Sequence, residues 1–374
     1  MNEISLTRLQ ETLREKGCPA AILTNPATLT WLTGYAPPIQ TGPSPFEGGA
    51  AIGVWWEGQL TLLLSDMEAP AAQALGVQTR EYVSYTIEEP VLGFDHQAQA
   101  FGELIAPLKN FKDKVAVELN FLSARLYPIL AQTLPVDQWI IVDNDVPPLR
   151  AVKSPPEIEK IRAALAVADS AQMIVKRLLQ VGLSEIELWG QLKAGLEHQV
   201  GGRLPVLADL VGGSRTAEIG GLPGEYRVQA GDPLIADIVP RLDGYWGDNA
   251  ATYFVGEPSP EHRKVYEVVR ETLEKGLEAV RPGLKACDLD ALLRQHIEGK
   301  GYPVYPHHSG HGLGVTYHEE PRIVPYNDLP LQAGMVLALE PGVYLPDQGL
   351  GVRLEDVVLV TQDGCEVLTH HLGR

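Results

Sequence analysis

Apolar and polar positions alternate with two different periods along the first half of the chain. Between Leu6 and Lys16, leucines recur at helical spacing among charged residues, and the apolar run that follows, over 19–24, has the length of a short buried strand. Further elements follow in the same manner. They are strands over 50–56, 59–64 and 115–118, and helices over 69–75 and 123–132. This alternation predicts an α/β domain.

The periodic pattern stops near residues 143–148 and resumes in a long amphipathic segment. Ser154 is a good helix cap, because two prolines and an acidic residue follow it in the first turn. We expect a helix from Pro155 to about Leu179 whose apolar face lies against the sheet of a second domain. A chain of 374 residues exceeds what one hydrophobic core usually serves. We therefore place a domain boundary near Arg150, which gives domains over 1–150 and 151–374.

The amino-acid composition indicates which broad class of protein this chain belongs to. The hydrophobic fraction of 45% is that of a globular protein, and no apolar run reaches the roughly 18–20 residues of a membrane helix. The first residues show no secretory signal, and the three cysteines are few and widely spaced, so we expect a soluble, cytoplasmic protein with reduced thiols. The net charge of −18 would repel polyanions, which argues against nucleic-acid binding.

Acidic residues interrupt several apolar strand segments in the second half. Asp237 lies inside an apolar run that leads into a hairpin, and Asp248 lies on the predicted return strand. Glu340 ends the run that begins at Met335, and Glu355 precedes another apolar run. Any one of these acids could form a salt bridge or cap a turn. Burying several of them is costly without a partner or a metal ion, so the set points to a common cation site.

Two other kinds of catalytic or binding site do not fit. The glycines of the segment Gly310-His-Gly-Leu-Gly alternate, which differs from the GxGxxG spacing of a dinucleotide-binding loop. The chain has no GxSxG elbow, and Ser309 beside His308 has no evident acid to complete a catalytic triad. Nucleotide binding and serine hydrolysis are therefore poor hypotheses.

These segments together resemble the motifs of the pita-bread metallopeptidases, the family of aminopeptidase P, prolidase, methionine aminopeptidase and creatinase. Asp237 and Asp248 stand eleven residues apart, and His311 lies in a GHGxG segment with His318 seven residues later. Glu340 and Glu355 lie in EPGxY and RxED segments. The resemblance is strong from about residue 150 to the end. It implies a smaller N-terminal creatinase-like α/β domain followed by a pita-bread domain with a curved antiparallel sheet and helices.

The resemblance also implies a two-metal centre. Asp237 would hold one ion, His311 and Glu340 the other, and Asp248 and Glu355 would bridge both. Four carboxylates offset the charge of two divalent ions, and oxygen ligands with one imidazole favour manganese first, with zinc, cobalt or iron as alternatives. A hydroxide bridging the ions would attack an amide carbonyl, and Glu340 would accept its proton and pass it to the leaving nitrogen.

The family pattern suggests roles for three further residues. His307 and His318 match positions that contact substrate or stabilise the tetrahedral intermediate, and Arg353 matches an arginine that could orient a carboxylate near the metals. We therefore expect His307, His318, Glu340 and Arg353 to be catalytic. His308 is expected to be structural.

Two departures from the family pattern concern the surroundings of the metals. Gly220 stands where the branch that cleaves bonds to proline usually has a histidine, seventeen residues before Asp237. Ala250 and Ala251 replace a hydroxyl-bearing residue and an arginine that commonly follow the second aspartate. These changes weaken the prediction of substrate specificity more than the prediction of metal binding.

The leading hypothesis is a metallopeptidase that hydrolyses short peptides, of the Xaa-Pro aminopeptidase or dipeptidase type. One alternative is a creatinase-like hydrolase of small amides or amidines, and another is a peptide-binding module without catalysis. A homodimer is expected, with the stretch over 37–56 as a possible interface. Sequence does not decide between aminopeptidase and dipeptidase action, identify the metal, or show whether proline is required.

Overall fold

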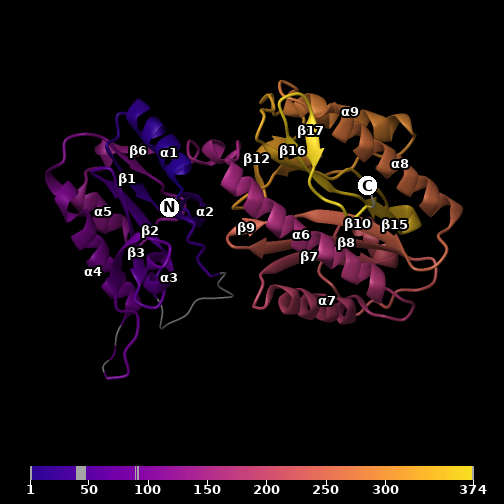
Figure 1. Ribbon diagram of the computed structural model, residues 1–374, viewed down its shortest axis with the longest axis horizontal. Helices are drawn as coiled ribbons and strands as arrows, with labels where there is room; N and C mark the ends of the chain where they lie inside the picture. Colours follow the sequence, from indigo (N-terminus) through magenta and orange to yellow (C-terminus); the bar gives the residue numbers. More distant parts are fainter. Residues whose placement is uncertain (1, 39–47, 89, 91, 373–374) are drawn as a thin grey trace. The chain divides into compact units, whose positions relative to one another are not determined.

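The backbone of the computed structural model separates into two compact units, residues 1–150 and 151–374 (Figure 1). The structure describes residues 2–38, 48–88, 90 and 92–372. The proposed dimer stretch over 37–56 lies partly outside these residues. Each unit has its own hydrophobic core. None of the described helices is long and apolar enough to cross a membrane.

The first unit is an α/β domain around a mixed six-stranded sheet in the order β4-β3-β2-β1-β5-β6. The strands are β1 (Ala20–Leu23), β2 (Ile52–Trp56), β3 (Gln59–Ser65), β4 (Gln78–Tyr82), β5 (Val115–Val117) and β6 (Trp139–Ile141). The helices are α1 (Glu3–Glu15), α2 (Pro26–Thr33), α3 (Ala69–Gln73), α4 (Gly93–Ile105) and α5 (Tyr127–Thr133). Strands β1 and β2 and strands β2 and β3 pair antiparallel, whereas the other three pairs are parallel. The predicted α/β class of this half is confirmed.

Several elements of the first unit differ from the sequence prediction. Helix α5 begins at Tyr127, four residues later than predicted, because turns precede it. Strands β4 and β6 were not predicted, and both lie at sheet edges, where a strand needs less apolar character. Trp31 and Tyr35 are only 1% and 3% exposed, so these aromatics pack in the core.

The second unit combines antiparallel sheets with four long helices. Its helices are α6 (Pro155–Leu178), α7 (Glu185–Val200), α8 (Pro260–Ala279) and α9 (Ala286–Gly299). One sheet contains β7 (Val206–Gly212), β8 (Pro233–Leu242), β9 (Tyr245–Trp246) and β10 (Asn249–Phe254). A five-stranded sheet contains β11 (Gly310–Gly312), β12 (Glu319–Ile323), β13 (Val336–Leu339), β16 (Asp356–Val360) and β17 (Cys365–Val367), and β14 (Gly342–Leu345) pairs with β15 (Leu350–Arg353). This arrangement is the expected pita-bread fold.

Helix α6 lies along the sheet of β8 and β10, as its apolar face predicted (Figure 1). Ser154 and Glu157 form a capping box at its start. Apolar residues of α6 and α7 pack against β7 and β8, whereas those of α8 and α9 pack against β13 and β16. An isolated bridge between Ala250 and Glu355 joins the two parts. The acidic positions identified in the sequence meet beside this bridge.

Candidate active site

Three of the predicted acids come together because neighbouring strands carry them. Asp237 lies in the middle of β8, opposite Ala250 of β10, and Asp248 immediately precedes β10. Glu355 reaches the same place through its bridge with Ala250, whose carbonyl accepts the Glu355 N–H at 2.9 Å. Asp248 and Glu355 are 3% and 1% exposed. The pairing of β8 with β10 and the bridge at Ala250 therefore bring three carboxylates together.

His311 is held in β11, an inner strand of the five-stranded sheet, by its two glycine neighbours. A Cβ at Gly310 would lie 2.1 Å from the Ala338 carbonyl oxygen, and one at Gly312 would lie 2.3 Å from the Glu320 carbonyl oxygen. Neither position tolerates a side chain, because strands β12 and β13 approach too closely. The short strand β11 is therefore fixed between its neighbours.

The His311 ring is oriented by a backbone hydrogen bond. Its Nδ1 lies 3.0 Å from the Gly312 carbonyl oxygen, which can only accept, so Nδ1 carries the proton. The unprotonated Nε2 then lies 3.5 Å from Oε1 of Glu340 and 3.8 Å from Oδ2 of Asp248. Glu340 is placed by its own N–H, which donates to the Ser309 carbonyl at 3.0 Å. The free nitrogen of His311 therefore faces carboxylates.

The donor set fits divalent cations. Asp248, His311 and Glu355 offer ligand atoms that lie within 4.8 Å of one another, and all three are buried. Oε1 of Glu355 is buried without a hydrogen-bond partner among the described residues. Buried carboxylate oxygens of this kind are satisfied by hard or borderline ions.

The pKa values in this cluster show that the ionised carboxylates repel one another strongly. Burial, with the charges of nearby carboxylates, raises the pKa of Asp237 to about 6 even though Arg353 opposes the rise. Burial and the neighbouring Asp237 raise the pKa of Asp248 well above its ordinary value, and burial and Asp248 do the same for Glu355. A pair of divalent ions would offset this repulsion.

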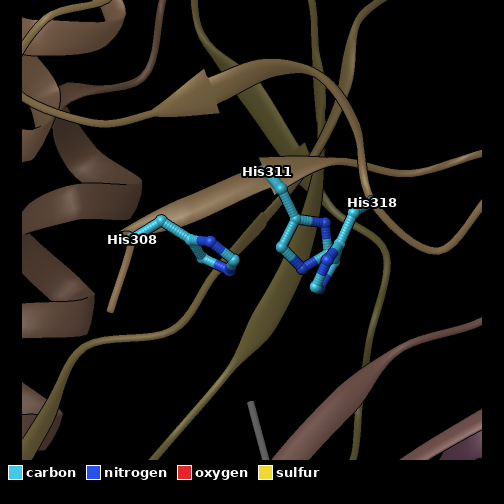
Figure 2. Close-up of side chains that lie close together, drawn as sticks. All are labelled: His308, His311 and His318. Carbon is cyan, nitrogen blue, oxygen red and sulfur yellow. The ribbon is translucent and has the colours of Figure 1, made fainter. Parts of the chain in front are cut away.

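The imidazoles of His308, His311 and His318 lie close together (Figure 2). The ring centroids of His311 and His318 lie 4.3 Å apart, and those of His308 and His318 lie 5.0 Å apart. Nε2 of His308 lies 2.7 Å from Oε1 of Glu340, a contact that the sequence analysis did not predict. Burial would raise the pKa of Glu340, but the hydrogen bond from His308 and the nearby histidines lower it to about 2.

The predicted residues His307 and Arg353 are connected through Tyr344, which the sequence analysis missed. His307 donates from Nδ1 to the His308 carbonyl at 2.8 Å, so its Nε2 accepts from the Tyr344 hydroxyl at 3.0 Å. The Arg353 guanidinium contacts the Tyr344 hydroxyl at 3.3 Å and donates to Oδ2 of Asp237 at 2.7 Å. Arg353 therefore orients a carboxylate of the protein itself.

A second network fixes the segment that carries the histidines. Arg294 of α9 donates to the carbonyls of Tyr305 and His307 at 2.7 and 2.6 Å. Its own partner Asp290 accepts from the Ser309 hydroxyl at 2.6 Å. The backbone on both sides of His307 is thus attached to helix α9, on which Asp290 and Arg294 form an i,i+4 ion pair.

The site opens into a cavity of about 550 Å³, which is within the usual size of small-ligand pockets. Its floor contains Asp237, Asp248, His311, Glu340 and Glu355. Its walls include Ile186, Trp189, Leu207, Asp209, Leu222, Pro223, Tyr317 and His318. The cavity therefore combines a charged floor with a largely apolar wall.

Comparisons with known proteins show the family of this chain. Residues 159–362 match the model of metallopeptidase family M24, and residues 6–152 match that of the Creatinase/Prolidase N-terminal domain. The chain is 30% identical to an uncharacterized peptidase of Staphylococcus aureus (strain USA300), over 98% of this chain and 99% of that protein.

Solved structures show the same two-domain fold. An Xaa-Pro dipeptidase from Bacillus anthracis superposes with a TM-score of 0.82 at 26% identity, over 98% of this chain and 96% of the other. An X-Pro aminopeptidase from Thermotoga maritima gives the same TM-score and identity, over 97% of each chain. The chain is a peptidase that belongs to metallopeptidase family M24, with a Creatinase/Prolidase N-terminal domain before its pita-bread domain.

Proposed function

We propose that this peptidase hydrolyses short peptides with the help of two divalent metal ions, in the manner of an Xaa-Pro aminopeptidase or dipeptidase. The observation that carries the proposal is the buried group of Asp248, His311 and Glu355, with Asp237 and Glu340 lining the same cavity. Within the chain, we assign this chemistry to residues 151–374 and regard residues 1–150 as the accessory domain.

The five floor residues would hold the ions. Asp237 would hold one, His311 and Glu340 the other, and Asp248 and Glu355 would contact both. Such ions lower the pKa of water and polarise an amide carbonyl. Manganese fits the oxygen-rich donor set best, with zinc, cobalt and iron as the other candidates.

The remaining side chains would handle protons and substrate. Glu340 is ionised, because His308 lies against it, and its carboxylate can accept a proton and return it to the leaving nitrogen. His318 lines the cavity, and burial lowers its pKa to about 4, so its neutral ring can contact a carbonyl or an amide. Arg353 orients Asp237, and Nδ1 of His307 lies 3.8 Å from Oε2 of Glu340.

The substrate proposal is supported by the size of the cavity and by the solved relatives. One of those relatives is described as an Xaa-Pro dipeptidase and the other as an X-Pro aminopeptidase, at equal identity to this chain. Both cleave next to proline by their descriptions. Short peptides with proline in the second position are therefore the first substrates to test. The homodimer and the cytoplasmic location stay predictions.

The test is a peptide panel with metal-loaded protein. Metal content is measured first, and about two ions per chain are expected. Di- and tripeptides with and without proline at the second position are then assayed, with Asp248→Asn as the matched inactive control. Cleavage that needs metal and is lost in the variant supports the proposal. A fully loaded protein that cleaves no peptide of the panel would refute it.

A further inference from the structure

Asp209 lines the cavity and lies next to Gly220. It is on β7, directly opposite Asp237 of β8, and residues opposite each other in antiparallel strands project from the same face of the sheet. A Cβ on Gly220 would lie 1.9 Å from Oδ2 of Asp209. The carboxylate of Asp209 therefore occupies space that any side chain at residue 220 would need.

One oxygen of this carboxylate is committed and the other is available. Oδ2 accepts a hydrogen bond from Nη2 of Arg353 at 3.1 Å. No described residue donates to Oδ1, and the side chain is 39% exposed toward the cavity that it lines. Arg353 already has Asp237 at 2.7 Å, so its charge is paired without Asp209. The guanidinium holds Asp209 in place while the second oxygen can bind a ligand.

The rest of the wall indicates the charge of that ligand. Apart from the four acids of the floor, Asp209 is the one charged Asp, Glu, Lys or Arg side chain among the described residues that line the cavity. Leu207, two residues earlier on the same face of β7, is 45% exposed, and Leu222 is 79% exposed. An apolar surface that ends at a carboxylate complements an aliphatic chain that ends in an ammonium group.

We propose that Asp209 binds an amino group of the peptide substrate, and so selects substrates that carry a positive charge at the residue preceding the cleaved bond. This inference rests on the proposed peptidase function and adds the substrate class. The ammonium comes either from the free N-terminus or from a lysine side chain. Both supply the same donors, and the two sources are separated by the choice of substrates.

The test compares Asp209→Asn with the parent protein on variants of the best-cleaved panel peptide. The N-terminal residue of this peptide is either lysine or norleucine, whose side chains share an aliphatic stem but differ in charge. Each peptide is prepared with a free and with an acetylated α-amino group. Glu278→Gln, an exposed site on α8, controls for the loss of one negative charge. Metal content and melting temperature of each variant are measured as well, because a general structural defect would change them.

If Asp209 contacts the lysine side chain, Asp209→Asn should raise KM about tenfold for lysyl peptides alone. A tenfold change is the usual effect of losing one charge-assisted hydrogen bond. An N-terminal contact predicts a similar rise for every free-amino peptide and none for acetylated ones. Either pattern, with kcat little changed, supports the proposal. An equal effect on all four peptides, a change confined to kcat, or no effect overturns it.

A second variant tests the position of the carboxylate separately from its charge. Gly220→Ala keeps Asp209 but forces its carboxylate to move, so the preference for the charged peptide should fall, and Asp209→Glu should retain part of it. An unchanged preference in Gly220→Ala would contradict the proposal. If the loaded parent protein cleaves nothing, the proposed function fails; if it cleaves peptides without this selectivity, only the inference about Asp209 fails.

Discussion

Replacing Glu355 by glutamine should change stability in opposite directions with and without metal. The side chain is 1% exposed, its Oε1 lacks a hydrogen-bond partner among the described residues, and burial and Asp248 raise its pKa well above the ordinary value. In metal-free protein near neutral pH, the carboxyl group therefore destabilises the fold. A neutral amide of the same shape removes that cost.

The magnitude follows from the burial of an unpartnered oxygen. A buried polar group without a hydrogen-bond partner costs about 1–3 kcal/mol, and a charged group costs more. Since the new amide must still be buried, we expect Glu355→Gln to stabilise the metal-free protein by about 2 kcal/mol, or roughly 4–8 °C in melting temperature for a domain of this size. With manganese at a hundredfold excess over Kd, the parent protein gains about 2.7 kcal/mol that the variant should largely lose.

The assay is calorimetry of both proteins in chelator and in manganese. The variant should melt above the parent in chelator and below it in manganese. Glu278→Gln, which changes an exposed acid, serves as the control. Its effect on the melting temperature should be the same in chelator and in manganese. A Glu355→Gln protein that is destabilised in both would show that the carboxylate has a structural partner, and the reasoning from metal binding would be refuted.

Two further predictions concern the same unit. Lys153 and Glu319 form an ion pair whose side chains are 1% exposed, so Lys153→Met should destabilise the protein by about 3–5 kcal/mol. The double variant Lys153→Met with Glu319→Leu should lose much less stability, because no charge is left buried without its partner. Denaturant unfolding measures both losses, and equal losses in the single and double variants would contradict this prediction. The folded pKa of Asp237 is raised, so its stabilising contribution is complete below pH 3.8 and is lost as pH rises through about 6. Metal-free parent protein should therefore lose stability relative to Asp237→Asn over this range, and parallel melting curves from pH 4 to 7 would disprove it.

The sequence predicted the fold and the floor of the site because both depend on strong local patterns. Acids inside apolar strands are costly, so Asp237, Glu340 and Glu355 were conspicuous without any structure. Edge strands such as β4 lack a clear apolar pattern, because no neighbouring strand covers one of their two edges. Their prediction needed the tertiary structure.

Side chains that act through partners distant in sequence could not be found from spacing. Asp209 belongs to the cavity because β7 pairs with β8 and because Gly220, eleven residues later, leaves room for it. His308 was expected to pack structurally, yet its ring reaches Glu340, thirty-two residues away in the chain. Contacts of this kind depend on sheet register and on the folding of loops, which no local pattern encodes.

The close packing around His311 has a consequence for how this scaffold can change. Its neighbours Gly310 and Gly312 permit no Cβ, so almost any substitution there would disturb the imidazole that faces the carboxylates. The wall residues Leu207 and Leu222, by contrast, are exposed and packed on one side only. A library randomised at the wall should therefore yield many folded proteins with new preferences, whereas one randomised at 310 and 312 should yield few. Substrate choice can thus diversify without disturbing the reaction centre.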